Sequence, residues 1–429
     1  MNERCAISLF KRFRNAQDGQ ALVVTGLAIV VLMLVAGLGV DVSYLLYQRN
    51  QMQKAADAAA IAGAVTRVYG GNYVTAGRND STANGFTHGS NGITVTINNP
   101  PQSGPFNGDN NYVEAIVAQP QPAFFMRVGG FNTVNVAARA VASAAGNANG
   151  CIYVMDPSDF DTFTATGTTT ASSACGIFVN SNNAAAFKDN GGACTITSGV
   201  TIVGNVDVDA CSTPAQSAFK TGVAPLSDPL SYLANPTCPG CQHFNNIHLN
   251  KNGTLSPGIY DGGIQINAGI SVTLNPGLYV LCGGGLKMSG GSISGTGVMF
   301  YNTDGSNAMC HNNAPAYGSI DVEGVTNSTL IASNTNTNNT YAGVLFFDDR
   351  QAATYANNPK NIFTGNASDN FTGAFYFPAS SLQYSGGNSQ AAYTIVVAWQ
   401  FTINGNAIFN DDYSSLPGGG LIHTAVMAE

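Results

Sequence analysis

Hydrophobic positions follow two contrasting patterns along this chain. Ala21 to Val40 is an unbroken apolar run of 20 residues without a charge. A helix of that length crosses the ~30 Å hydrocarbon core of a bilayer. From Gly150 onward, short β-branched and aromatic stretches alternate instead with Gly, Asn, Ser and Thr. The pattern predicts one long N-terminal helix followed by a mainly β chain.

The residues around the apolar run predict its orientation. Four basic residues precede it: Arg4, Lys11, Arg12 and Arg14. The positive-inside bias therefore places residues 1–20 in the cytoplasm and the bulk of the chain in the periplasm or at the cell surface. A secretory signal has a shorter apolar region, of about 7–15 residues. We expect a retained, single-pass inner-membrane helix over residues 21–40.

The helix is expected to continue beyond the membrane. Residues 41–68 contain strong helix formers and no proline. Small and apolar residues recur there at helical spacing: Leu45, Met52, Ala56, Ala59 and Gly63. This stripe fits packing either against the following domain or against other helices.

Residues 69–146 predict a small α+β head. Period-two alternation and turn signals favour four strands: Ile93–Ile97, Tyr112–Val117, Ala123–Met126 and Val134–Ala140. Glu114 is expected to face solvent from its strand.

Short repeats organise residues 147–429. Gly263–Asn267 returns as Gly285–Ser289, and a Gly-x-apolar-aromatic-aromatic pattern recurs at Gly297, Gly343 and Gly373. Repeats near 20 residues are typical of a right-handed parallel β-helix, with a β-sandwich as the alternative. Prolines interrupt the pattern at residues 211–243.

The N-terminal segment resembles a known family. Asp18-Gly19-Gln20-Ala21, the apolar run, Asp41 and the stretch from Tyr47 to Ala60 are similar to the N-terminus of TadE/TadG-like Flp pilus-assembly proteins. In pilins of this system a prepilin peptidase cuts after a glycine, and the fifth mature residue is glutamate. Gly19 and Gln20 would be that processing site, but the fifth residue is Val24. The resemblance therefore implies an uncleaved, TadG-like anchor.

The composition limits which classes of function are possible. Charged residues make up only 9% of the chain. Residues 1–150 hold 10 Lys+Arg and 7 acids, a net charge of +3; the other residues hold 6 and 17, a net of −11. An acidic half with so few basic residues repels phosphate backbones, which argues against nucleic-acid binding.

Eight of the nine cysteines follow the anchor: Cys151, Cys175, Cys194, Cys211, Cys238, Cys241, Cys282 and Cys310. An even number in an exported segment favours disulfides. Cys151–Cys175 and Cys194–Cys211 are candidate pairs, although the pairing cannot be read from sequence. Cys238-Pro-Gly-Cys241 fits a loop disulfide best; zinc with His243 and His248, or redox chemistry, is the weaker alternative.

Acidic doublets are the remaining candidate chemistry. Asp348-Asp349 and Asp411-Asp412 follow predicted strands, where solvated turn acids or calcium ligands are expected. Neither lies in a recognisable set of catalytic carboxylates.

We therefore expect a non-enzymatic component of the Flp/Tad pilus machinery without a cofactor. Its expected partners are the membrane and other pilus components, and its exported β domain is a candidate adhesive surface. The alternatives are a surface glycan-binding module and, less favoured, a polysaccharide-degrading β-helix enzyme.

Overall fold

A computed structural model describes residues 18–68, 71–147, 150–167, 170–208, 211–311, 314–334, 340–351, 360–388, 390–416 and 420–429. The chain divides into two compact units. Unit 1 contains residues up to Gly146 together with Thr424–Glu429, and unit 2 contains Asn147–His423.

The described part of unit 1 consists of two helices and an antiparallel sheet. Its elements are α2 (Asp18–Val68), α3 (Tyr73–Ala83), β1 (Thr94–Asn98), β2 (Tyr112–Pro122), a 3-10 turn (Met126–Gly129), β3 (Thr133–Asn147) and β29 (His423–Met427). The sheet order is β1-β2-β3-β29, so the end of the chain supplies an edge strand.

The C-terminal half of α2 packs against this sheet. Met52, Ala56 and Ala59 are buried against the strand residues Val95 and Val113. A Cβ on Gly63 would lie 3.0 Å from Val113 Cγ1, so the helix approaches the sheet closely there. The small-residue stripe thus packs within unit 1, which is the first of its two predicted uses.

Unit 2 is a parallel β-helix. The described strands of neighbouring rungs pair in parallel, and they form three faces. Four strands are long enough to bend from one face into another: β14 (His243–Leu249), β16 (Gly258–Ile266), β19 (Leu286–Thr303) and β24 (Asn370–Phe377).

The first face contains, from one end of the stack to the other, β14 (His243–Leu249), β16 (Gly258–Ile266), β18 (Gly277–Cys282), β19 (Leu286–Thr303), β22 (Val344–Asp348), β24 (Asn370–Phe377), β26 (Thr394–Ala398), β4 (Gly150–Val154), β7 (Gly176–Val179), β10 (Val200–Ile202) and β13 (Lys220–Thr221). The second face adds β20 (Ile320–Val325), β23 (Lys360–Thr364), β25 (Ser381–Ser385), β27 (Phe401–Asn404), β5 (Phe163–Thr166), β8 (Phe187–Asn190) and β11 (Val206–Val208). The third face contains β15 (Gly253–Leu255), β17 (Ser271–Leu274), β21 (Thr329–Ala332), β28 (Ala407–Phe409), β6 (Thr170–Ser173), β9 (Cys194–Ile196) and β12 (Ser212–Thr213).

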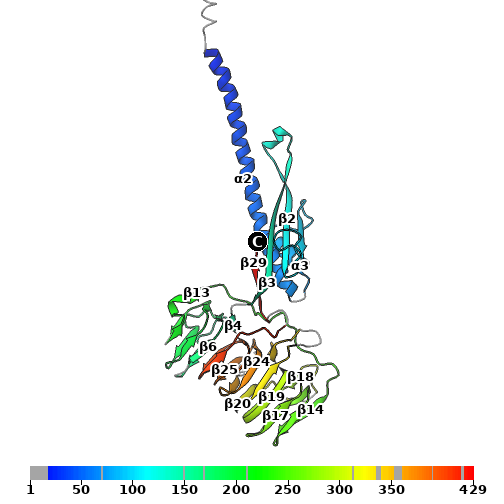
Figure 1. Ribbon diagram of the computed structural model, residues 1–429, viewed down its shortest axis with the longest axis vertical. Coiled ribbons are helices and arrows are strands. Elements are labelled where there is room, and N and C mark those ends of the chain that lie inside the picture. The colour runs from blue at the N-terminus through cyan, green and yellow to red at the C-terminus, as the bar shows by residue number, and fades with distance from the viewer. Residues whose placement is uncertain are drawn as a thin grey trace, which may run out of the picture. The chain divides into compact units, whose positions relative to one another are not determined.

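The chain enters this stack at an interior rung. Strand β4 pairs with β7 on one side. On its other side it pairs with β26, which belongs to the last rung in chain order. In Figure 1, β13 lies at one end of the β-helix, β14 at the other, and β4 between them. Residues 222–242 therefore connect the two ends along the outside, and we call this segment the strap. It lies within the predicted proline-rich interruption.

The predicted repeats occupy equivalent places in neighbouring rungs. Ile264 pairs with Leu286, and Phe300 pairs with Phe346. Inside the β-helix the rings of Phe300 and Phe346 stack with centroids 5.2 Å apart, and other aromatic rings extend the stack in both directions. The mainly β, parallel β-helix prediction is thus confirmed, and the parallel pairing is not that of a β-sandwich.

The first face is buried on both sides. Phe300 and Phe346 point into the interior, while their neighbours Tyr301 and Phe347 belong to a second apolar cluster on the outside. The strap covers this outer cluster with Leu230 and Leu233. Burial on both sides explains why these strands are continuously apolar in sequence.

Candidate functional site

The first candidate site is the anchor segment of α2. Helix α2 is long and apolar enough to cross a membrane, judged by its length and composition. Only 6% of its most apolar 18-residue stretch is buried. Large apolar side chains are exposed along it, among them Val31, Leu32 and Val35. An exposed apolar surface all round a helix is expected where lipid is the solvent.

Asp41 marks the place where α2 meets the hairpin of β2 and β3. Its carboxylate accepts hydrogen bonds from the backbone N–H groups of Phe124 (3.0 Å), Phe125 (2.9 Å) and Met126 (2.7 Å). These N–H groups are therefore unavailable to a strand ladder. The predicted strand at Ala123–Met126 is wrong for this reason, since the segment is a turn that leads into a 3-10 helix.

Glu114 is also placed differently from the prediction. Its side chain is fully buried rather than solvent-facing, and its Oε1 lies 2.5 Å from Arg139 Nε. It also accepts hydrogen bonds from Asn98, Ser103 and the Gln102 N–H. Burial alone would raise the pKa of Glu114, but these hydrogen bonds together lower it. The alternation of the strand could not reveal this, because the partners come from a distant loop and strand.

The cysteines after the anchor form four disulfides. They are Cys151–Cys175, Cys194–Cys211, Cys238–Cys241 and Cys282–Cys310. The first two are the candidate pairs named from the sequence. Because Cys238 bonds to Cys241, neither is a free thiolate for zinc.

The sequence predicted solvated turn acids at Asp348 and Asp349, but both residues are buried. Asp348 is fully buried and accepts hydrogen bonds from Asn302, Tyr317 and Ser380. Asp349 accepts from the Tyr301 and Thr303 hydroxyls. Protein donors thus occupy both carboxylates, which makes them poor candidates for calcium.

The other acidic doublet is exposed, as expected for turn acids. Asp412 accepts a hydrogen bond from the Ser414 N–H, 3.1 Å away.

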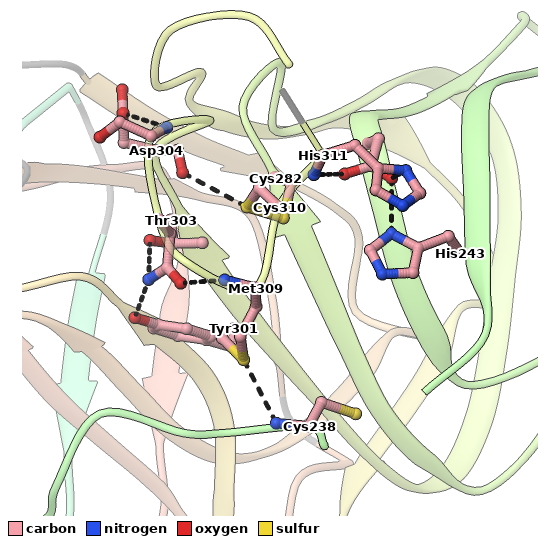
Figure 2. Close-up of a disulfide and its surroundings, with 12 residues drawn as sticks. Cys238, His243, Cys282, Tyr301, Thr303, Asp304, Met309, Cys310 and His311 are labelled. Atoms are coloured by element: carbon pink, nitrogen blue, oxygen red, sulfur yellow. Dashed lines mark hydrogen bonds and ion pairs between the residues drawn. A yellow bond between two sulfur atoms is a disulfide. The ribbon is translucent and has the colours of Figure 1, made fainter. Parts of the chain in front are cut away.

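A histidine cluster lies beside the Cys282–Cys310 disulfide (Figure 2). His243 Nδ1 lies 2.7 Å and His311 Nδ1 lies 2.9 Å from the same oxygen, Asp261 Oδ2. The two imidazole rings stack with centroids 3.7 Å apart. Their ligand atoms lie within 4.8 Å of one another, close enough for one ion.

Only part of this cluster was visible in the sequence. The sequence offers His243 as a zinc ligand only in the weaker alternative, together with Cys238, Cys241 and His248. His248 instead lies 3.0 Å from Asn246 Oδ1 and is outside the cluster. Asp261 and His311 are 50 residues apart, and only the register of the rungs and the disulfide bring them together.

Comparison with known proteins finds one likeness. The family model for putative Flp pilus-assembly TadE/G-like proteins matches residues 19–66, which lie within α2. The resemblance read from the N-terminal sequence is therefore confirmed for that segment. No curated protein and no solved structure matches the chain.

Proposed function

We propose that this protein is a TadG-like structural component of the Flp/Tad pilus machinery. Helix α2 would hold it in the inner membrane, with residues 1–20 in the cytoplasm and both folded units outside. The β-helix would then be presented to other pilus components or to an adhesion target. The observation that carries the proposal is the family match over residues 19–66, where an exposed apolar helix continues into a folded unit.

Two further features support this placement. Four disulfides in unit 2 favour an oxidising compartment. The basic residues before the apolar run favour retention of the N-terminus in the cytoplasm.

The geometry gives less support to glycan stacking on aromatic rings. Most of the aromatic side chains described in unit 2 pack in the two apolar clusters. Phe160 and Tyr232 are exposed exceptions, and they come from different parts of the chain.

The test is to shear pili from intact cells and quantify the protein by mass spectrometry in filament, membrane and soluble fractions. We expect it in the membrane, with Met1 or Asn2 still at its N-terminus. Enrichment in filaments with an N-terminus at Gln20 would make it a cleaved minor pilin and contradict the proposal.

A pair of matched variants separates anchoring from folding. Val31→Arg/Leu32→Arg adds two charges to the apolar run, each costing about 2.5–3.5 kcal/mol at a membrane centre. It should shift the protein out of the membrane fraction. Leu46→Arg/Tyr47→Arg changes similarly exposed positions of the same helix beyond Asp41 and should leave the protein in the membrane. Equal behaviour of the two variants would argue against an anchor at residues 21–40.

A further inference from the structure

We propose that His243, Asp261 and His311 form a binding site for a divalent transition-metal ion, with Zn²⁺ as the best-fitting ion. Imidazole nitrogen and carboxylate oxygen are ligands that Zn²⁺ accepts readily. Two nitrogens and one oxygen already converge here, at 2.7 and 2.9 Å from donor to acceptor.

Holding an ion needs a small expansion and a turn of one imidazole ring, because the lone pairs of two nearly parallel stacked rings do not point at one place. Bonds of about 2.0–2.2 Å in a tetrahedral arrangement separate neighbouring ligand atoms by about 3.4 Å. The two Nδ1–Oδ2 distances would therefore open by roughly half an ångström. His311 can make this adjustment because its side chain is 58% exposed.

The fold fixes the carboxylate and brings His311 to it. Asp261 Oδ1 accepts a hydrogen bond of 2.9 Å from the His311 backbone N–H. Asp261 also pairs across the rungs with Cys282, whose disulfide to Cys310 holds the residue before His311. Hydrogen bonds of this kind orient the ligands of metal sites.

Space is available for a fourth ligand. An open hollow of about 350 Å³ is lined by Asn245, Asn246, Asp261, Gly262 and His311, among others. Three protein ligands with one further position are the arrangement that lets a bound zinc accept water or a partner's side chain.

Zinc binding should be measured on the full chain in detergent, purified without a histidine tag or reductant. A Cys5→Ser background removes the one cysteine outside the four disulfides. Competition with a chromophoric chelator gives the affinity and the number of ions bound. The informative variants are His243→Gln and His311→Gln, and His248→Gln is the matched control outside the cluster.

We expect about one Zn²⁺ per chain, with affinity reduced about a hundredfold or more by His243→Gln or His311→Gln and unchanged by His248→Gln. Unchanged melting of the His311→Gln variant would show that its fold is intact. Failure of the parent chain to bind Zn²⁺ at micromolar concentration would overturn the proposal. Equal binding by the parent and His311→Gln would also overturn it, because the three residues would then be only a hydrogen-bonded group.

A separate observation in unit 1 supports a second inference, which rests on the proposed membrane anchor. We infer that the tip of the β2–β3 hairpin inserts into the bilayer interface beside α2. Its large apolar side chains are exposed: Phe124 (54%), Phe125 (46%), Val128 (78%) and Phe131 (63%). An exposed cluster of this kind needs an apolar partner.

Contacts with α2 place this tip at the membrane boundary. A Cβ on Gly37 would lie 2.4 Å from the Phe125 ring, so the ring packs directly on the helix. Asp41 holds the backbone of Phe124 and Phe125 one turn further along. Gly37 lies in the apolar run and Asp41 directly follows it, so lipid is the surrounding solvent at this height. Phe is among the side chains that interfacial segments bury at the boundary between headgroups and acyl chains.

Single cysteines carrying an environment-sensitive fluorophore can test the insertion in liposomes that contain lipid-attached quenchers. Val128→Cys reports the hairpin tip. Thr75→Cys, exposed on α3, is the control outside the membrane, and Val30→Cys reports α2 itself. The Cys5→Ser background is used throughout.

We expect strong quenching at residues 30 and 128 and little at residue 75. Quenching at residue 30 alone would overturn the hairpin inference and leave the anchor intact. Equal, weak quenching at all three positions would contradict the anchor as well.

Discussion

Replacing Asp348 with asparagine should remove a pH-dependent loss of stability from the β-helix. The carboxyl group is fully buried and accepts hydrogen bonds from Asn302 (3.0 Å), Tyr317 (2.5 Å) and Ser380 (2.5 Å). Burial raises the pKa of Asp348 to about 7, and the three hydrogen bonds offset this only in part. The value of about 7 includes a smaller rise caused by the neighbouring Asp349 carboxylate.

The direction of the effect follows from proton binding. The ordinary pKa of the group is 3.8, which we take for the unfolded chain. Between pH 3.8 and about 7 the native protein keeps a proton that the unfolded chain has released. The free energy of unfolding therefore falls as the pH rises through this window and levels off above it. A difference of about three pKa units corresponds to on the order of 4 kcal/mol.

Urea denaturation at pH 5 and pH 8 can measure the part of this contribution that lies between pH 5 and about 7, which is on the order of 3 kcal/mol. The chain has a single tryptophan, Trp399, and it lies in unit 2, so its fluorescence reports the β-helix separately from unit 1. Asparagine fits the site, because its oxygen accepts from Asn302 and Tyr317 while its amide can donate to the Ser380 hydroxyl. Glu323→Gln, at an exposed position on β20, is the control.

The parent chain and Glu323→Gln should lose stability between pH 5 and pH 8, and Asp348→Asn should lose much less. Equal midpoints for the parent chain at the two pH values would refute the reasoning. So would an Asp348→Asn variant that keeps the full pH dependence.

Three further substitutions test other parts of the structure. Glu114→Gln removes the charge that pairs with Arg139 and should cost unit 1 about 1–3 kcal/mol, measured by amide hydrogen exchange, because Arg139 is 23% exposed and keeps its ion pair with Glu429. Because the pKa of Glu114 is lowered, the parent's unit 1 should itself lose stability as the pH falls through and below about 4.5. Arg350→Lys removes hydrogen bonds to the strap and should cost about 2–3 kcal/mol and speed proteolysis within residues 222–242, mapped by mass spectrometry. Phe346→Ala leaves a cavity in the aromatic stack and should cost about 3–5 kcal/mol in urea denaturation.

The sequence predicted the features that depend on local pattern. The apolar run predicted the long helix α2, and the repeats at Gly297 and Gly343 predicted strands that pair in register. Both signals are periodic or continuous over many residues, so they survive without knowledge of tertiary contacts.

Features that depend on distant partners could not be predicted. Glu114 and Asp348 look like ordinary polar strand positions, and only their partners from other segments show that they are buried. The return of the last six residues to unit 1 could not be predicted either, because no change in composition or pattern precedes them. The histidine cluster takes its residues from β14, β16 and the loop after β19, so it too depends on contacts between distant positions. The order of the rungs, which departs from chain order where β26 meets β4, could not be predicted either.

That order has a physical consequence for the β-helix. Residues 150–173 meet residues 394–409 at an interior junction, for example where Ile152 pairs with Val396 and Phe163 with Phe401. Each disulfide links cysteines no more than 28 residues apart, so none crosses this junction. Among the described residues, the two parts of the stack are joined there by strand pairing, side-chain packing and hydrogen bonds such as that from Gln400 to Asp156, without a covalent cross-link.

The strap is the other connection between these two parts, and its contacts lie on both of them. Leu226 exchanges two hydrogen bonds with Asn180, in the part that begins at β4. Arg350, in the other part, donates to the carbonyl oxygens of Leu230 and Leu233. A repeat stack is ordinarily stabilised by contacts between nearest neighbours. Here the strap adds contacts that span many rungs, so separating the two parts at the junction would also require releasing the strap. We therefore expect the two parts to unfold together rather than one after the other.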